Sequence, residues 1–228
     1  MSADLQKRIA GEAAAELVET GMVVGLGTGS TAAWFVKALA ARGLSDIRGV
    51  PTSTATEALA LELGLKLTSL DEVQHIDLTV DGADEIGPGL SLIKGGGAAL
   101  LREKLVWEAS ARCVVIADAA KSVPVLGAFP LPIEVVAFGH KTTLIRLNEA
   151  LRACGLDVTP RLRVKDGQMV ATDGGNLIYD AACGAIPDPA RLAEALKRVT
   201  GVVDHGLFLG LADEALIGQD AGVERLAL

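Results

Sequence analysis

Three consecutive glycines stand between a lysine and a glutamate, all within ten residues of the chain. Lys94 precedes Gly95–Gly97, and Glu103 lies on the helix-forming segment that follows. Glycine loses the most backbone freedom on folding, so such a run indicates a close approach of the main chain, often to an anion at a helix start. The stretch therefore places a cation, a cradle of amides and a carboxylate close together. The alternative is a flexible turn and a solvated glutamate between Arg102 and Lys104.

A second glycine-rich segment, Gly25–Thr31, reads Gly-Leu-Gly-Thr-Gly-Ser-Thr after a short apolar run. Small hydroxyl side chains and backbone amides at the start of a helix suit a phosphate group. The segment lacks the third glycine of a dinucleotide-binding fingerprint, and no Gly-Lys-Ser/Thr of a nucleotide P-loop follows it. The alternative is a tight turn in which Ser30 or Thr31 is the N-cap of the next helix.

A third segment, Asp81–Glu85, carries three carboxylates in five residues at the end of an apolar strand. Their mutual repulsion must be relieved by water, by a cation or by catalytic use. A magnesium site is conceivable because hard cations take carboxylate oxygens, and simple solvation at the surface is the other interpretation.

Strand, loop and helix alternate through the first half of the chain, which predicts an α/β fold with a mostly parallel sheet and helices on both faces. In such sheets ligands bind beyond the carboxyl ends of the strands, where all three loops lie. The expected strands are 22–26, 47–50, 76–80 and 113–117, and the expected helices are 5–17, 31–41, 54–63 and 98–110.

The pattern changes near Pro124 to a smaller α+β unit of the ferredoxin-like type. Its expected elements are a strand at 133–137, a helix at 142–154, strands at 158–164, 168–171 and 176–180, and a helix at 189–199. We predict a catalytic domain over 1–127, completed by 203–228, and an inserted domain over 128–202 that contributes oligomer contacts. The apolar segment 207–217 is expected to return to the first sheet.

The amino-acid composition and the net charge argue against several classes of function. The 228-residue chain is half apolar, has 3% aromatic residues and carries a formal charge of −8 without a cluster of basic residues, which argues against nucleic-acid binding. No apolar run reaches the roughly 18 residues of a membrane helix, and the N-terminus lacks a signal-type core. We therefore expect a soluble cytoplasmic protein that does not bind membranes. The cysteines are odd in number and widely spaced, as in a reduced chain: Cys113, Cys154 and Cys183.

The three loops, in this order, resemble those of the type A ribose-5-phosphate isomerases. The resemblance spans nearly the whole chain and continues through Lys121, Leu131–Val135, Thr172–Asn176 with Asp180, and Gly206–Phe208. Ala120 departs from the family pattern, which commonly has a hydroxyl residue there, and the departure concerns one minor hydrogen bond.

The resemblance implies interconversion of ribose 5-phosphate and ribulose 5-phosphate in the non-oxidative pentose phosphate pathway, without a metal or organic cofactor, by a homodimer or larger assembly. It makes Glu103 the catalytic base. The chemistry of ring opening and of the enediol then favours Asp81, Asp84 and Lys94 as further catalytic groups. From the residues alone, Lys7 reads as solvated. The implied substrate-binding positions are Lys7, Gly27, Thr28, Gly29, Ser30, Thr31, Asp81, Gly82, Ala83, Asp84, Lys94, Gly95, Gly96, Gly97 and Lys121.

Two other functions stay open at this point. Related folds serve as effector-sensing domains of sugar-responsive transcription regulators, which need a DNA-binding module ahead of the domain, whereas this sequence begins with the first helix of the domain. A coenzyme A transferase is a fold relative with a glutamate nucleophile. Glu103 and Asp81 favour an enzyme over a sensing domain.

Overall fold

The computed structural model describes residues 2–227 and divides them into two compact units. The first unit comprises the residues up to Ala83, Arg102–Ser122, and the residues from Gly210 onward. The second unit comprises Asp84–Leu101 and Val123–Leu209. The chain therefore passes from the first unit to the second between Ala83 and Asp84, inside the acidic segment.

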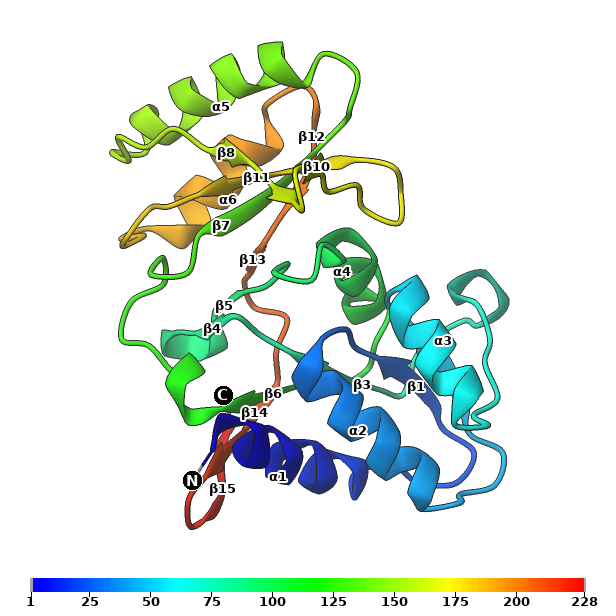
Figure 1. The fold of residues 1–228 in the computed structure, drawn as a ribbon. Helices are drawn as coiled ribbons and strands as arrows, with labels where there is room; N and C mark the ends of the chain where they lie inside the picture. Colours follow the sequence, from blue (N-terminus) through cyan, green and yellow to red (C-terminus); the bar gives the residue numbers. More distant parts are fainter. Residues whose placement is uncertain (1, 228) are drawn as a thin grey trace. The chain divides into compact units, whose positions relative to one another are not determined.

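The first unit contains a six-stranded, mostly parallel sheet with the order β15-β14-β6-β3-β1-β2 (Figure 1). All neighbouring pairs are parallel except β14 and β15, which form an antiparallel hairpin. The strands are β1 Val23–Leu26, β2 Arg48–Pro51, β3 Leu78–Gly82, β6 Cys113–Asp118, β14 Glu214–Gln219 and β15 Gly222–Ala227. The helices are α1 Ala3–Ala15, α2 Ser30–Ala41, α3 Thr54–Glu62 and, from Arg102 onward, α4 Leu100–Glu108, with short 3-10 turns η1 Leu70–Glu72 and η3 Ala119–Lys121.

Helices cover both faces of this sheet, as the sequence predicts. Successive side chains of a strand point to opposite faces, so neighbouring residues of β1 belong to different apolar clusters. Val24 packs in a cluster with Phe35 of α2 and other residues of α1 and α2. Val23 packs in a second cluster with Val106 of α4. The central strands are buried along their length, which explains their nearly continuous apolar runs.

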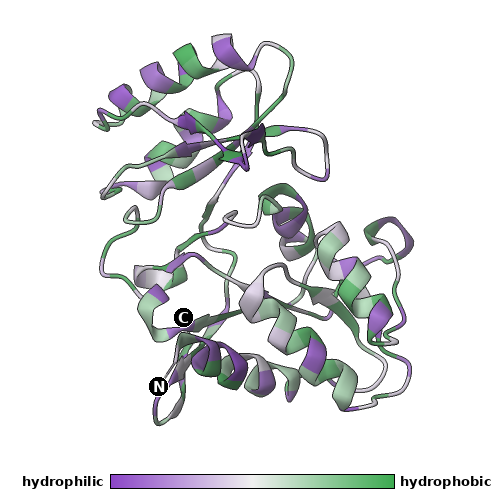
Figure 2. Cartoon of the chain, viewed as in Figure 1, coloured by the Kyte–Doolittle hydropathy of each residue, from purple (hydrophilic) through white to green (hydrophobic). Residues whose placement is uncertain are grey.

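The second unit contains a four-stranded antiparallel sheet with the order β12-β7-β11-β8, together with two helices. The chain order of strand, helix, two strands, helix and strand is that of the ferredoxin-like fold. Its elements are β7 Leu131–Val135, α5 His140–Ala153, β8 Arg161–Leu162, β11 Leu177–Ala181, α6 Pro189–Lys197 and β12 Val202–His205. Hydrophilic and hydrophobic residues alternate along α5 in Figure 2, as expected for a helix with one face on a sheet.

Two small sheets complete the second unit. One is the hairpin of β9 Val164–Lys165 and β10 Gln168–Met169. The other pairs β13 Leu207–Phe208 with β5 Leu92–Ile93, which in turn pairs with β4 Glu85–Ile86 ahead of the 3-10 turn η2 Pro88–Leu90. Residues 84–101 therefore belong to the second unit.

The expected return of segment 207–217 to the first sheet is only half correct. Leu207–Phe208 pairs with β5 in the second unit, and only β14 joins the six-stranded sheet. Gly210 separates the two strands and has a φ of 65°, a backbone conformation that favours glycine. An apolar run predicts burial but does not specify the sheet that buries it.

Candidate active site

Asp81 lies near the carboxyl end of β3 and is fully buried. Its Oδ1 atom accepts hydrogen bonds from the backbone amides of Thr28, at 3.0 Å, and of Gly82, at 2.7 Å. Gly27 makes this approach possible, because a Cβ atom at this position would lie 2.2 Å from the same oxygen. The first glycine-rich loop is thus built around a carboxylate.

Thr28 also lies in a cluster of hydroxyl groups. Its Oγ1 atom is 2.7 Å from that of Thr52 and 2.8 Å from Oγ of Ser53, the N-cap of α3. Thr56 extends the cluster and donates to the Gly27 carbonyl at 2.9 Å. Segment 51–54, which carries two of these hydroxyl groups, is not among the site residues predicted from the sequence. The position of this segment at the carboxyl end of β2, beside β1, is the signal that identifies it as support for the loop.

The start of α2 carries the predicted phosphate-binding residues. Gly29, rather than Ser30 or Thr31, is the N-cap, and as a glycine it offers no side chain to cap the helix. Lys7 is half-buried instead of solvated, and its Nζ donates to Oγ of Ser30 at 3.1 Å. The backbone amides at this helix start and the Lys7 ammonium together suit an anion.

Lys121 lies in η3, which packs against helix α1 in the same unit. The Gln6 side chain, next to Lys7 in the sequence, accepts a hydrogen bond from the Ala119 amide at 3.3 Å. This contact holds the turn that carries Lys121 against the helix that carries Lys7.

Glu103 lies in the first turn of α4, and only 3% of its surface is exposed. Its neighbour Lys104 is 9% exposed, and Trp107, one turn further on, is 1% exposed. A solvated glutamate, the alternative offered by the sequence, is therefore excluded. A carboxylate withdrawn from bulk water on a rigid helix can act as a general base.

In the second unit, Lys94 is only 2% exposed although it carries an ammonium group. Its backbone amide donates to the Gly206 carbonyl at 2.9 Å, and its Nζ lies 5.4 Å from the centre of the Phe208 ring. A buried lysine beside an aromatic face supplies localised positive charge in an otherwise acidic protein.

Asp84 is held by the triple-glycine loop of the same unit. The Gly96 amide donates to Oδ2 of Asp84 at 2.8 Å, and a Cβ atom at this glycine would lie 2.6 Å from Oδ1. Gly95 has a φ of 107°, which few other residues tolerate. The run of glycines therefore serves a loop that closes on a carboxylate, and Gly96 and Gly97 form its exposed turn.

The acidic segment does not act as one cluster. Glu85 is buried, and its carboxylate accepts hydrogen bonds from the backbone amides of Gly127 and Phe129, at 2.7 and 2.5 Å. Glu85 therefore holds the loop 127–129 within the second unit. Within residues 2–227, no group of three or more histidine, cysteine, aspartate or glutamate side chains is arranged to hold a metal ion.

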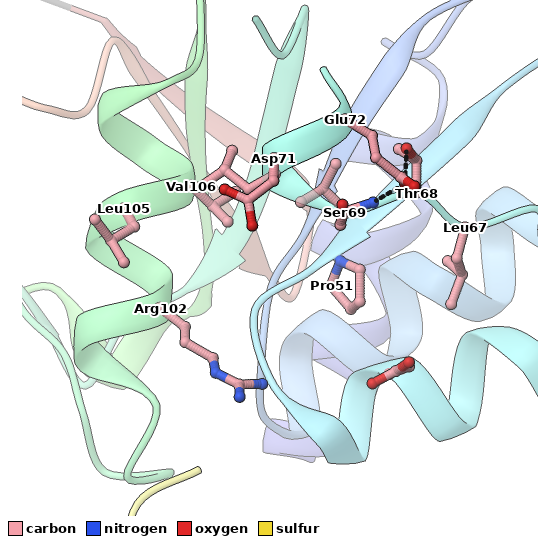
Figure 3. A pocket seen from close by; sticks show the side chains of 12 residues that line it. Pro51, Leu67, Thr68, Ser69, Asp71, Glu72, Arg102, Leu105 and Val106 are labelled. Atoms are coloured by element: carbon pink, nitrogen blue, oxygen red, sulfur yellow. Dashed lines mark hydrogen bonds between the residues drawn. The ribbon is translucent and has the colours of Figure 1, made fainter. Parts of the chain in front are cut away.

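A separate cavity of about 610 Å³ opens in the first unit between β2, α3, η1 and α4 (Figure 3). Thr68, Glu72 and Arg102 are among its polar lining residues, and Leu67 and Leu105 are among the apolar ones. Of the site residues predicted from the sequence, none lines this cavity.

Residues 48–222 match the family model for ribose 5-phosphate isomerase A (phosphoriboisomerase A). The ribose-5-phosphate isomerase A of Caulobacter vibrioides is 76% identical over 226 residues, which cover 99% of both chains. This chain belongs to the ribose-5-phosphate isomerase A family. The family member from Parvibaculum lavamentivorans is 52% identical and covers 98% of each chain.

Solved structures of the isomerase family agree with this assignment. The ribose 5-phosphate isomerase of Plasmodium falciparum has a TM-score of 0.93 and 36% identity, with 99% of each chain covered. A D-ribose-5-phosphate isomerase in complex with phospho-erythronic acid has a TM-score of 0.92 and 40% identity over the whole of both chains. Among residues 2–227, no helix has the length and apolar character needed to cross a membrane.

Proposed function

We propose that this chain interconverts the aldose D-ribose 5-phosphate and the ketose D-ribulose 5-phosphate through a cis-enediol. The observation that carries the proposal is the 76% identity to a ribose-5-phosphate isomerase A over 99% of the chain. The buried Glu103 favours an enzyme over a domain that only senses a sugar phosphate. It is also the residue type that moves protons between adjacent carbons.

Glu103 is the proposed base. Moving the carbonyl from C1 to C2 requires removal of the proton at C2 and its return at C1. One carboxylate performs both transfers when both carbons lie within its reach. Burial of Glu103 on α4 supports this role, since a fixed side chain loses little freedom in the reaction.

The sugar ring must open before isomerisation. We assign Asp81 as the base that takes the proton of the anomeric hydroxyl, because two backbone amides hold its carboxylate in a fixed orientation. Asp84 positions substrate hydroxyls, and Lys94 stabilises the negative charge that develops on the enediol oxygen. Neither role requires a metal ion or an organic cofactor.

The phosphate of the substrate binds at the start of α2, where Lys7 contacts Ser30. Within the predicted loop Gly27–Thr31, the amides from Gly29 onward and the hydroxyls of Ser30 and Thr31 bind the phosphate, and Lys121 adds charge. The amides of Gly27 and Thr28 instead donate to the Val80 carbonyl and to Asp81. A phosphate fixed at one end of the sugar orients C1 and C2, so binding energy far from the reacting atoms contributes to the rate.

We place the protein in the cytoplasm as a homodimer, with the second unit contributing subunit contacts. Phe138, in the connection between β7 and α5, is 94% exposed, and Ile145, on α5, is 60% exposed. Phe138→Asp should lower the mass of the particle in sedimentation equilibrium from that of a dimer to that of a monomer. An unchanged mass would place the contacts elsewhere.

The function is tested by incubating the purified chain with ribose 5-phosphate and measuring ketose formation. We expect rapid formation of ribulose 5-phosphate up to equilibrium. Binding of ribose 5-phosphate without turnover would indicate a sensing domain instead, and exchange between coenzyme A thioesters would indicate a transferase.

A further inference from the structure

Arg163 follows β8 in the second unit and lies beside the triple-glycine loop, far from it in the sequence. Only 14% of its side chain is exposed. Its Nη1 atom donates to the carbonyl oxygens of Gly95, at 2.8 Å, and of Gly96, at 3.1 Å. The other edge of the planar guanidinium binds Asp180, with Nε donating to Oδ2 at 2.8 Å and Nη2 donating to Oδ1.

The peptide between Gly95 and Gly96 links Arg163 to Asp84. A trans peptide is planar, and its C=O and N–H groups point in opposite directions. The Gly95 carbonyl points to Arg163, and the Gly96 amide of the same peptide points to Oδ2 of Asp84 at 2.8 Å. Fixing one side of this plane therefore fixes the direction of the hydrogen bond on the other side.

The orientation of the Gly95–Gly96 peptide depends on its hydrogen-bond partners, because both residues are glycines. Gly95 and Gly96 have the widest backbone freedom of any residue, so the loop needs an external partner to keep one conformation. The Asp84 backbone is held independently, because its amide donates to the Ile93 carbonyl at 2.8 Å. The contact with the Gly96 amide therefore bears on the carboxylate of Asp84 and not on its backbone.

We propose that Arg163, oriented by Asp180, is a positioning residue that sets the Asp84 carboxylate through the Gly95–Gly96 peptide. The proposal rests on the proposed function in one respect, the role of Asp84 in turnover. Asp180 is part of the device because its carboxylate binds Nε and Nη2 at once, which leaves Nη1 directed at the two carbonyls.

A guanidinium is required for this arrangement. It presents several donors in a rigid plane, whereas the ammonium of lysine is a single point of charge. Arg163→Lys should therefore keep the charge and lose the simultaneous contacts to Asp180 and the loop. We expect a fall in kcat on the order of tenfold for Arg163→Lys and up to a hundredfold for Arg163→Ala. Arg161→Ala is the matched control, because Arg161 lies two residues away on β8 and is exposed.

A double-mutant cycle separates positioning from a general structural role. Residues that act through one another give non-additive effects, and independent residues give additive ones. We expect Arg163→Ala to lower kcat strongly in the wild-type background and by less than twofold, about the limit of additivity error, in the Asp84→Asn background. Equal losses of kcat in both backgrounds would overturn the proposal.

A second measurement does not depend on activity, so it remains decisive if the proposed isomerisation fails. Hydrogen exchange of the Gly96 amide is followed by NMR in the wild-type protein, Arg163→Lys, Asp180→Asn and Arg161→Ala. We expect exchange at least tenfold faster in the first two variants and unchanged in the Arg161 control. Unchanged exchange in folded Arg163→Lys and Asp180→Asn would show that the arginine does not hold this peptide, whatever the activity of the wild-type protein.

Discussion

The backbone amide of Thr28 donates a hydrogen bond to Oδ1 of Asp81 across 3.0 Å. The second unit repeats this relationship, with the Gly96 amide bound to Oδ2 of Asp84 at 2.8 Å. In both cases a glycine allows the main chain to reach a carboxylate that the sequence places three residues from the other. The glycines of both loops therefore serve first to orient acidic side chains.

Gly27→Ala tests the first of these contacts. The added methyl group would lie 2.2 Å from Oδ1 of Asp81, so the carboxylate or the loop must move. We expect kcat to fall and the free energy of unfolding to decrease by about 1–3 kcal/mol, the usual cost of overpacking. Gly174→Ala is the control, because its nearest neighbour would be 3.5 Å away. Wild-type kinetics in Gly27→Ala would mean that the orientation of Asp81 is unimportant.

Lys7→Ala and Lys121→Ala test the phosphate site. The protein has a net charge of −8, so attraction of an anion depends on a few close groups. A charge-assisted hydrogen bond is worth about 1.5–3 kcal/mol, so each variant should raise KM for ribose 5-phosphate roughly tenfold or more. Unphosphorylated ribose should be a very poor substrate.

Lys37→Ala provides the control for charge alone, because Lys37 lies over the Trp34 ring of the same helix, at 4.8 Å from its centre. A KM that changes equally in Lys7→Ala, Lys121→Ala and Lys37→Ala would indicate a general electrostatic effect. Efficient turnover of free ribose would contradict a phosphate anchor altogether.

We expect the free energy of unfolding to fall at high pH because of the buried thiol of Cys113. Burial, together with the nearby Asp213 carboxylate, raises the pKa of the Cys113 thiol from 9.0 to about 12. Between these values the unfolded chain releases the thiol proton while the folded chain keeps it. Stability is therefore fully present below pH 9 and falls as the pH rises, with a contribution from this group of at most about 1.4 kcal/mol per pH unit.

Guanidinium chloride unfolding at several pH values between about 9 and 11 measures this slope. In Cys113→Ala the free energy of unfolding should fall less steeply with pH, even if the variant is less stable throughout. Cys154→Ala serves as the comparison at a partly exposed thiol. Parallel curves for Cys113→Ala and the wild-type protein would show that this thiol is not the group that titrates.

Metal chelation should leave the isomerase fully active. Lys94 supplies positive charge in the second unit, and Glu85 is bound by the amides of Gly127 and Phe129. The measurement is ketose formation after exhaustive treatment with EDTA. Activity that is lost with EDTA and restored by magnesium or manganese would make the acidic residues metal ligands.

The sequence predicts the main elements of the fold because their periodicity is strong. The expected helix 31–41 corresponds to α2 at Ser30–Ala41, and the expected strand 113–117 corresponds to β6 at Cys113–Asp118. Short strands are harder to predict from the sequence, since two residues cannot show a periodic pattern. β4, β5 and β13 were therefore missed as a sheet, and the expected strand 158–164 is reduced to β8 and the start of β9.

Contacts that hold the site residues in place cannot be predicted from the sequence. Glu103 could be singled out by its place after the glycines, but its burial depends on how α4 packs. The role of Arg163 cannot be predicted from its neighbours in the sequence, because its hydrogen-bond partners Gly95 and Asp180 are distant from it along the chain. Such contacts become visible only when the topology brings β8, β11 and the glycine loop together.

In the proposed mechanism Glu103 carries the proton between C2 and C1. Glu103→Gln keeps the shape of the side chain and removes its basicity, and general acid–base catalysis is worth roughly 10²–10⁴-fold. The decisive measurement is kcat for ribulose 5-phosphate formation by this variant, beside its affinity for ribose 5-phosphate and the exposed control Glu108→Gln. We predict a loss of kcat in that range for Glu103→Gln, with nearly unchanged affinity and a fully active control. Turnover by Glu103→Gln close to that of the wild-type protein would show that Glu103 is not the base.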